Sequence, residues 1–264
     1  MSETRRTVLI TGASAGIGEA FAHHAAARSY NVVLVARRLN RLDELAASLA
    51  DAHGIDAHVF AVDLSEPGAP ESIVDFTDDL GIPIDVLINN AGLSTSTPFT
   101  RTEWSDLSGQ IQIMMTAPTE LSHRLIPPMI ERGWGRIINV SSLAALLPPT
   151  RGSLYTPIKR YLFDFSQSLH NEVHGRGVNV TALCPGLTHT EFHEVMGTQT
   201  EADKIPGFMW GNTSEVVNAG WNAVMAGNPI CVPRAVDKAV AALMHPVPLR
   251  LHPRIVSMFD PFRD

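Results

Sequence analysis

Short apolar runs alternate with longer helical patterns along most of the chain. Runs rich in Val, Ile and Leu recur at 7–10, 32–35, 58–62, 85–88, 136–140, 178–183 and 230–232. Helical spacing of apolar residues predicts helices over 18–28, 39–52, 70–80, 103–132, 154–174, 214–226 and 235–245. The strand patterns are continuous and do not alternate with polar residues, so we expect both faces of the sheet to be buried.

This order of elements predicts an α/β fold with a doubly wound and mostly parallel sheet of about seven strands and helices on both faces. Since no long polar linker or internal repeat divides the sequence, residues 1–264 are expected to form one domain. The irregular segment 187–212 interrupts the pattern, and such segments are typical of binding loops. The Pro-rich tail 246–264 could contact substrate, a partner or the domain's own surface.

Composition and charge narrow the class of protein. The chain is 45% hydrophobic and 18% charged, which excludes intrinsic disorder. Its net charge of −7, without a Lys/Arg cluster, gives no footprint for nucleic acid or anionic lipid. Two cysteines cannot form a disulfide framework, and neither a membrane-span pattern nor a signal-peptide pattern is present. We therefore expect a cytoplasmic protein with no nucleic-acid or membrane partner.

A Gly-rich turn joins the first predicted strand to the first predicted helix. Glycines let the backbone approach a pyrophosphate closely, and the N–H groups at the start of the following helix bind its charge. The alternative is that these glycines form a plain turn. The position of the segment between the first strand and the first helix favours a phosphate site. The expected contacts are Thr11, Gly12, Ser14, Gly16, Ile17 and Gly18.

Further motifs follow this turn in a fixed order. They are Asp63-Leu64, Asn89-Asn90-Ala91-Gly92, Ser142, Tyr155-Thr156-Pro157-Ile158-Lys159 and Pro185-Gly186. With the G-x-x-x-G-x-G spacing behind Thr11, this set resembles the classical short-chain dehydrogenase/reductase (SDR) family between residues 5 and 240. The resemblance implies that residues 1–264 form one NAD(P)-binding domain with a Rossmann fold. It also implies a nicotinamide cofactor, hydride exchange with a small-molecule carbonyl or alcohol substrate, and a homo-oligomer, either dimer or tetramer.

The end of the second predicted strand indicates which nicotinamide cofactor is used. An acidic residue there binds the ribose hydroxyls of NAD, whereas an arginine accommodates the 2′-phosphate of NADP. This sequence has Arg37 and Arg38, so it predicts NADP(H) over NAD(H), with Arg37 as the main contact and Ser14 assisting. Alternatively, both arginines simply begin a solvated helix.

The resemblance implies the remaining cofactor contacts. It places Asp63 against the adenine, Asn90 near the adenosine ribose, and Thr188 and Thr190 near the nicotinamide carboxamide. Each of these residue types is also common in caps and turns. Leu64, Ala91, Gly92, Pro185 and Gly186, together with Tyr155 and Lys159, complete the expected cofactor site.

Ser142, Tyr155 and Lys159 are the expected catalytic residues. Tyr155 and Lys159 are four residues apart, so on a helix they share one face. A phenol is a poor acid–base group at neutral pH, and a neighbouring ammonium lowers its pKa. The resemblance assigns Tyr155 as acid and base, Lys159 to ribose binding and to lowering the pKa of Tyr155, and Ser142 to orienting the carbonyl. Pro157 fits this helix only within its first turn.

One position departs from the family pattern. The family's fourth catalytic residue is an asparagine in the long helix after the fourth strand, and the register places Met114 there. A thioether donates no hydrogen bond, so the proton relay behind Lys159 would lose a side chain. A backbone carbonyl, or Gln110 one turn earlier, could replace it. A non-catalytic NADP(H)-binding sensor or interaction protein is therefore the alternative to an enzyme.

The segment between Gly186 and Thr213 concentrates apolar side chains. They are either a small core under the loop or, as we expect, one wall of an apolar substrate pocket opposite Leu146-Leu147-Pro148-Pro149. The residues are Phe192, Met196, Phe208, Met209 and Trp210. His189 and His193 have a spacing that metal sites use, but no other ligand pattern accompanies them, so no metal is expected.

Overall fold

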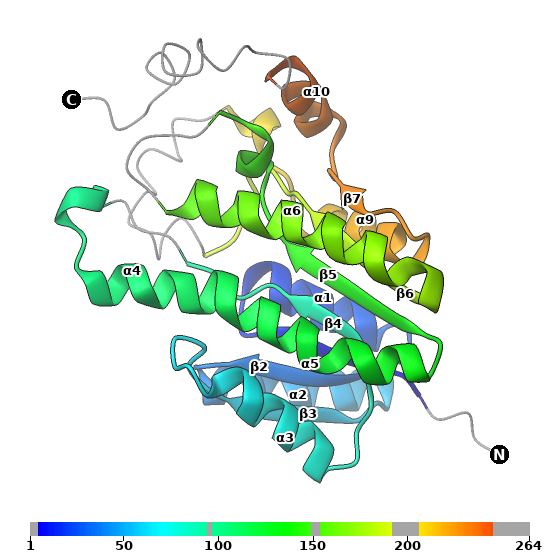
Figure 1. Ribbon diagram of the computed structural model, residues 1–264. Helices are drawn as coiled ribbons and strands as arrows, with labels where there is room; N and C mark the ends of the chain where they lie inside the picture. Colours follow the sequence, from blue (N-terminus) through cyan, green and yellow to red (C-terminus); the bar gives the residue numbers. More distant parts are fainter. Residues whose placement is uncertain (1–4, 94–96, 149–153, 192–205, 245–264) are drawn as a thin grey trace.

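The computed structural model describes residues 5–93, 97–148, 154–191 and 206–244, and these residues form one parallel sheet sandwiched by helices (Figure 1). The strand order is β3-β2-β1-β4-β5-β6-β7, and every pairing is parallel. The order reverses between β1 and β4, as in a doubly wound sheet. The strands are β1 Thr7–Thr11, β2 Asn31–Ala36, β3 Ala57–Ala61, β4 Ile84–Asn89, β5 Gly135–Val140, β6 Val178–Leu183 and β7 Ile230–Cys231.

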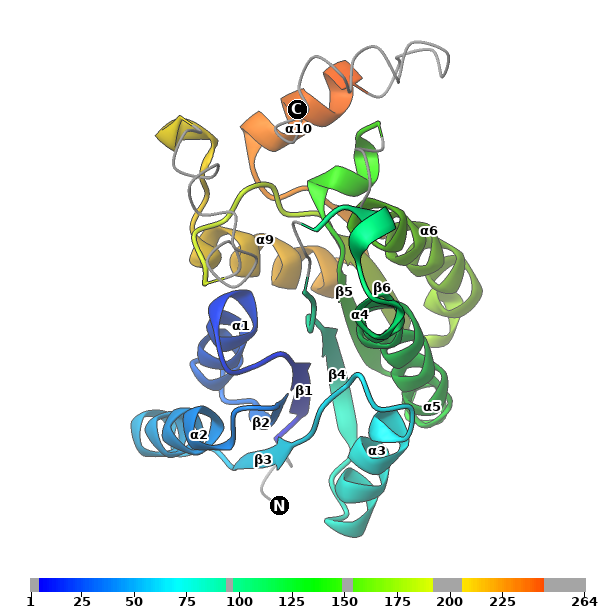
Figure 2. The same cartoon turned by 90° about the vertical axis from the view of Figure 1, so that its left-hand side faces the viewer.

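Helices cover both faces of the sheet, so the predicted fold is confirmed (Figure 2). One face carries α1 Gly16–Ala26, α2 Leu39–His53 and α9 Thr213–Met225. The other carries α3 Ala69–Asp79, α4 Trp104–Ile111, α5 Ala117–Glu131 and α6 Tyr155–Val173. Helix α10, Ala235–Met244, follows β7, and short 3-10 turns lie at Phe99–Arg101, Leu143–Leu146, His174–Arg176 and Gly207–Met209. Among the helices of the described ranges, none is both long and apolar enough to cross a membrane.

The predicted helix over 103–132 is not continuous. Helix α4 ends at Ile111, a π-helical turn (η2) spans Gln112–Thr116, and α5 follows. Pro118 is the second residue of α5 and has no N–H, so it cannot bond the carbonyl of Met114, four residues earlier. This missing bond gives a local reason for the change of hydrogen-bond pattern. The π turn, a feature frequent at functional sites, places Met114 at the break.

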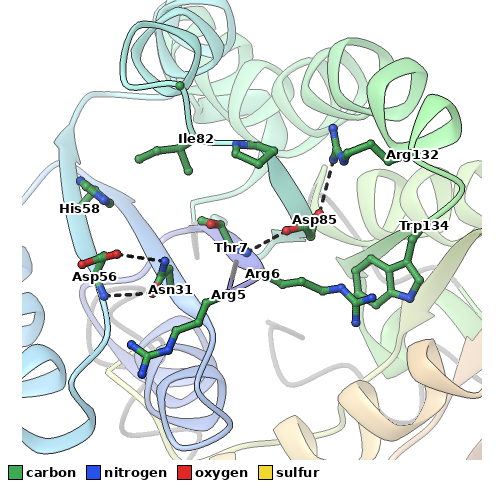
Figure 3. A pocket seen from close by; sticks show the side chains of 12 residues that line it. Arg5, Arg6, Thr7, Asn31, Asp56, His58, Ile82, Asp85, Arg132 and Trp134 are labelled. Carbon is green, nitrogen blue, oxygen red and sulfur yellow. Dashed lines mark hydrogen bonds and ion pairs between the residues drawn. The ribbon is translucent and has the colours of Figure 1, made fainter. Parts of the chain in front are cut away.

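A cavity of about 410 Å³ opens at the edge where the strands begin (Figure 3). The Asp85 carboxylate accepts a hydrogen bond from the backbone N–H of Thr7 at 3.0 Å and pairs with Arg132 at 3.6 Å. The Arg6 guanidinium stacks 3.8 Å from the Trp134 ring centroid. These contacts join the starts of β1, β4 and β5, so we interpret this edge as structural. Ligands of open α/β sheets bind at the opposite edge.

Candidate active site

A cavity of about 620 Å³ lies at the carboxyl ends of the strands and gathers most of the predicted site. The predicted residues that line it are Gly12, Ser14, Gly16, Ile17, Arg37, Arg38, Asp63, Leu64, Asn90, Ala91, Gly92, Ser142, Tyr155, Lys159, Pro185, Gly186, Thr188 and Thr190. Thr11 and Gly18 are not among the lining residues. Segments between residues 12 and 191 therefore meet at one edge of the sheet.

The Gly-rich turn has the geometry of a phosphate site. Gly12 and Gly16 have φ of +66° and +61°, a region that strains other residues. A Cβ on Gly18 would lie 2.2 Å from the Gly12 carbonyl oxygen, so the helix can pack against the turn only with glycine there. Helix α1 starts at Gly16 without a side-chain cap from Ala15. Its first N–H groups therefore remain available to an anion.

Thr11 and Asn90 act by holding this turn in place. The Thr11 hydroxyl oxygen accepts hydrogen bonds from the N–H groups of Asn90 and Ala91, at 3.0 and 3.1 Å. The Asn90 amide donates to the carbonyl oxygens of Thr11 and Gly12, at 3.0 and 3.2 Å. These bonds fix the end of β4 to the end of β1. The position of the Gly-rich turn thus depends on two residues that the sequence indicated only as cofactor contacts.

The two arginines after β2 take different positions. Arg38 donates to the Ser14 hydroxyl at 3.1 and 3.2 Å and also to the Ser14 carbonyl. The Arg37 side chain is 67% exposed and pairs with Asp63 at 3.6 Å. We expected Arg37 to be the main contact, but in this structure Arg38 is the arginine that is bonded to the Gly-rich turn.

Two charged residues at this end were not predicted. Glu191, which lines the cavity, pairs with Arg38 at 3.1 Å and with Arg41 at 2.7 Å. Both arginines hold the pKa of Glu191 below its usual value through hydrogen bonds, so the carboxylate is ionised at neutral pH. The partners are about 150 residues apart in sequence, and no local pattern predicts such a contact.

The catalytic candidates meet at the opposite end of the cavity. Helix α6 begins at Tyr155, so Pro157 lies in its first turn as predicted, and Tyr155 and Lys159 share one face. The Lys159 ammonium donates to the Val140 carbonyl oxygen at 2.7 Å and lies 5.6 Å from the Tyr155 ring centroid. The Ser142 hydroxyl accepts from the Ala144 N–H at 3.2 Å and shares a hydrogen bond with Tyr155.

Burial controls the protonation of this pair. It lowers the pKa of Lys159 from 10.5 to about 8, because the charged form loses hydration. It also raises the pKa of Tyr155, and the hydrogen bond with Ser142 offsets this only in part. The net direction follows from burial of the phenol, which outweighs the hydrogen bond from Ser142. The expectation that Lys159 lowers the pKa of Tyr155 stays a prediction.

Met114 lies next to Lys159, where the register predicts it. Its side chain is completely buried. A Cβ built on Gly92 would lie 3.5 Å from the Met114 Sδ and 3.6 Å from the Lys159 Nζ, so both atoms approach the same point. Gln110 is buried in α4 and is not part of the cavity lining. The thioether is therefore the side chain that the structure brings to the same glycine as the ammonium.

The apolar part of the cavity differs from the one we expected. Its lining includes Leu93, Ile113, Leu143, Leu147 and Leu187. Leu147 was predicted, whereas Trp210 stacks on His189 with ring centroids 4.7 Å apart and is not a lining residue, and neither is Met209. Pro149, Phe192, Met196, His193 and the tail 246–264 lie outside the described residues, as does the Phe208 side chain. Within the described ranges, no group of three or more His, Cys, Asp or Glu side chains could hold a metal.

Known proteins share both this sequence pattern and this arrangement. The family described as "short chain dehydrogenase" matches residues 6–201. A serine 3-dehydrogenase of Agrobacterium fabrum is 36% identical over 203 residues, covering 75% of this chain and 79% of that protein. A short-chain dehydrogenase from Sphingobium yanoikuyae, solved with NADPH, has a TM-score of 0.79 and 31% identity, covering 92% of this chain and 96% of that one. A bulky-bulky ketone specific alcohol dehydrogenase from Comamonas testosteroni has a TM-score of 0.76 and 27% identity, covering 93% and 96%.

Proposed function

The chain belongs to the short-chain dehydrogenase family, and from this we propose that it transfers a hydride between NADP(H) and a carbonyl or secondary alcohol, with Tyr155 as acid and base. The observation that carries the proposal is the meeting of Ser142, Tyr155 and Lys159 at one end of the cavity that begins at the Gly-rich turn. A nucleotide site and a proton donor thus share one cavity. The oxidoreductase class follows from the family, whereas the catalytic roles are our proposal.

NADP(H) is the proposed cofactor because cationic side chains lie at the ribose end. Arg38 and Ser14 offer guanidinium N–H groups and a hydroxyl beside the Gly-rich turn. A guanidinium binds a phosphate through paired, charge-assisted hydrogen bonds. The NADPH complex of the similar Sphingobium yanoikuyae protein supports the same choice. When bound, the cofactor would supply or accept the hydride.

Residues of this chain would donate and accept the proton that accompanies hydride transfer. In the reducing direction, the Tyr155 hydroxyl donates its proton to the substrate oxygen as that oxygen becomes an alkoxide. The Ser142 hydroxyl, bonded to Tyr155, orients the substrate oxygen and stabilises its developing charge. Lys159 is held by the Val140 carbonyl and stabilises the phenolate that remains. In the oxidising direction, the same Tyr155 oxygen takes the proton back.

The substrate is proposed to be apolar. Leu93, Ile113, Leu143 and Leu147 line the cavity that Tyr155 also lines, and such lining favours apolar ligands. The similar alcohol dehydrogenase from Comamonas testosteroni is specific for bulky-bulky ketones, which agrees with this choice. The single domain, cytoplasmic location and homo-oligomer expected from the sequence stay predictions.

Oxidation of NADPH across a panel of ketones and aldehydes tests the proposal. We expect turnover of at least one apolar carbonyl, and Tyr155→Phe should abolish most of it while NADPH affinity is kept. Tyr161→Phe is the matched control: it lies on the same helix and its hydroxyl bonds Thr119 at 2.8 Å, not the cavity. An equal loss in both variants would mean that Tyr155 is not the acid.

The alternative function is a non-catalytic NADP(H)-binding protein. Met114 favours it, because an apolar thioether lies beside Lys159 where the family pattern has an asparagine. NADPH binding without turnover of any panel substrate would support this alternative. Turnover that depends on Tyr155 would exclude it.

A further inference from the structure

A carboxylate lies between two guanidinium groups at the ribose end of the cavity. Glu191 binds Arg38 through one oxygen and Arg41 through the other, at 3.1 and 2.7 Å. The three side chains are 41–47% exposed, so water reaches the cluster and the ion pairs can exchange. Arg38 also holds Ser14 of the Gly-rich turn. The carboxylate is therefore attached to groups that, in the proposed function, bind phosphate.

Glu191 reaches this place from the far side of the cavity. It follows β6, whereas Arg38 follows β2, and β1, β4 and β5 separate these strands in the sheet. The preceding residue, Thr190, packs on the Gly-rich turn: a Cβ on Gly16 would lie 3.0 Å from its methyl carbon. The segment after β6 thus crosses the start of α1, and its carboxylate ends at the arginines after β2.

Resting on the proposed NADP(H) function, we propose that Glu191 competes with the 2′-phosphate of NADP(H) for Arg38 and Arg41. Carboxylate and phosphate oxygens use the same guanidinium N–H groups, and two anions repel each other there. A cofactor with the 2′-phosphate must therefore displace Glu191, whereas NAD(H) need not. Glu191 becomes a residue that sets how strongly the site prefers NADP(H) over NAD(H).

Binding of two nucleotides by calorimetry tests this without any turnover. Adenosine 2′,5′-bisphosphate carries the 2′-phosphate, and adenosine 5′-monophosphate lacks it. Glu191→Gln should tighten binding of the bisphosphate about 3- to 30-fold, as expected for losing two exposed competing ion pairs. Binding of the monophosphate should not change. Glu191→Ala is the second variant, because its side chain cannot hold either guanidinium.

A matched control separates competition from net charge. Glu71→Gln also removes one carboxylate, but Glu71 pairs with Arg124 at 3.1 Å, and neither residue lines the cavity. Its affinity for both nucleotides should equal that of the unmodified protein. An equal gain in Glu71→Gln, or an equal gain for the monophosphate in the Glu191 variants, would overturn the proposal because the effect would be general electrostatics.

The outcomes distinguish this inference from the proposed function. If neither Glu191 variant binds the bisphosphate more tightly, Glu191 does not compete and the inference fails, whatever the cofactor preference. If the unmodified protein binds both nucleotides equally, the preference for NADP(H) fails. In that case, a gain for the bisphosphate alone in the Glu191 variants would still support competition.

Discussion

Replacing Lys159 by methionine should stabilise the folded protein at neutral pH. Lys159 is only 4% exposed, and its ammonium makes a 2.7 Å hydrogen bond to the Val140 carbonyl. Burial lowers its pKa from 10.5 to about 8, so keeping this group charged destabilises the folded state. Methionine has a similar length and no charge to desolvate. The side chain proposed for catalysis thus lowers stability, as at many functional sites.

The size of the effect follows from the pKa. Each pKa unit corresponds to about 1.4 kcal/mol, so a fall from 10.5 to about 8 is on the order of 3 kcal/mol. Loss of this charge-assisted bond to Val140 offsets about 1.5–2 kcal/mol of this. The net gain of about 1–1.5 kcal/mol should raise Tm by roughly 2–6 °C in a domain of this size.

The pH dependence has a definite sign. Below the folded pKa of about 8, both folded and unfolded states carry the proton and the full cost of burying the charge is present. Between pH 8 and 10.5, the folded state releases its proton first, so the cost falls as pH rises. The Tm advantage of Lys159→Met should therefore be largest at pH 7 and mostly lost at pH 10.

Thermal melts of the purified variants at both pH values measure this. Lys238→Met is the control, because Lys238 is exposed on α10 and its loss should change stability by less than about 0.5 kcal/mol. A Tm for Lys159→Met at or below that of the unmodified protein at pH 7 would refute the reasoning. If the Tm of Lys159→Met exceeds that of the unmodified protein by the same amount at pH 7 and pH 10, the gain comes from packing and not from the removal of a buried charge.

Three further predictions concern other parts of the molecule. Met114→Asn should raise kcat several-fold and leave the KM for NADPH unchanged; the gain should be smaller than the ~10²–10⁴-fold effect of a full acid–base group. Met114→Leu should not raise kcat. A stable Met114→Asn variant with unchanged kcat would contradict a side-chain relay. Arg38→Gln should raise the Kd of NADPH about 10-fold and leave the Kd of NADH unchanged, whereas Arg37→Gln should raise the Kd of NADPH less. A larger effect of Arg37→Gln would make Arg37 the main contact of the 2′-phosphate. Asp85→Asn should lower the free energy of unfolding in urea by about 1–2 kcal/mol through its bonds to Thr7 and Arg132, and an unchanged urea midpoint would rule this out.

The sheet and the Gly-rich turn could be predicted because their causes are local. Continuous runs such as Val32–Val35 predict strands buried on both faces, and the structure buries this run between the parallel strands β1 and β3. The glycines at 12 and 16 are required by positive φ. The shared helix face of Tyr155 and Lys159 follows from helical periodicity alone. Each of these features is decided within a few residues of sequence.

Contacts between distant segments could not be predicted in the same way. One local feature, the π turn at Gln112–Thr116, was also missed, although Pro118 is a signal for it in the sequence. The ion pairs of Glu191 join segments far apart in sequence, and no spacing indicates them. The effect of burial on the pKa of Tyr155 was not predicted either, because a pattern of residues shows which charges are near but not how much water is lost.

At Met114, a proton relay through the backbone can be distinguished from a relay through the side chain. The π turn and Pro118 leave the Met114 carbonyl without its usual N–H donor four residues on, while the thioether packs toward Gly92 and Lys159. A relay that used the backbone at this turn would tolerate methionine, whereas a relay that used a side chain would not. The break in the helix is present although the asparagine of the family pattern is absent. Because a backbone relay could use this turn, Ser142, Tyr155 and Lys159 together favour an enzyme over a cofactor-binding sensor.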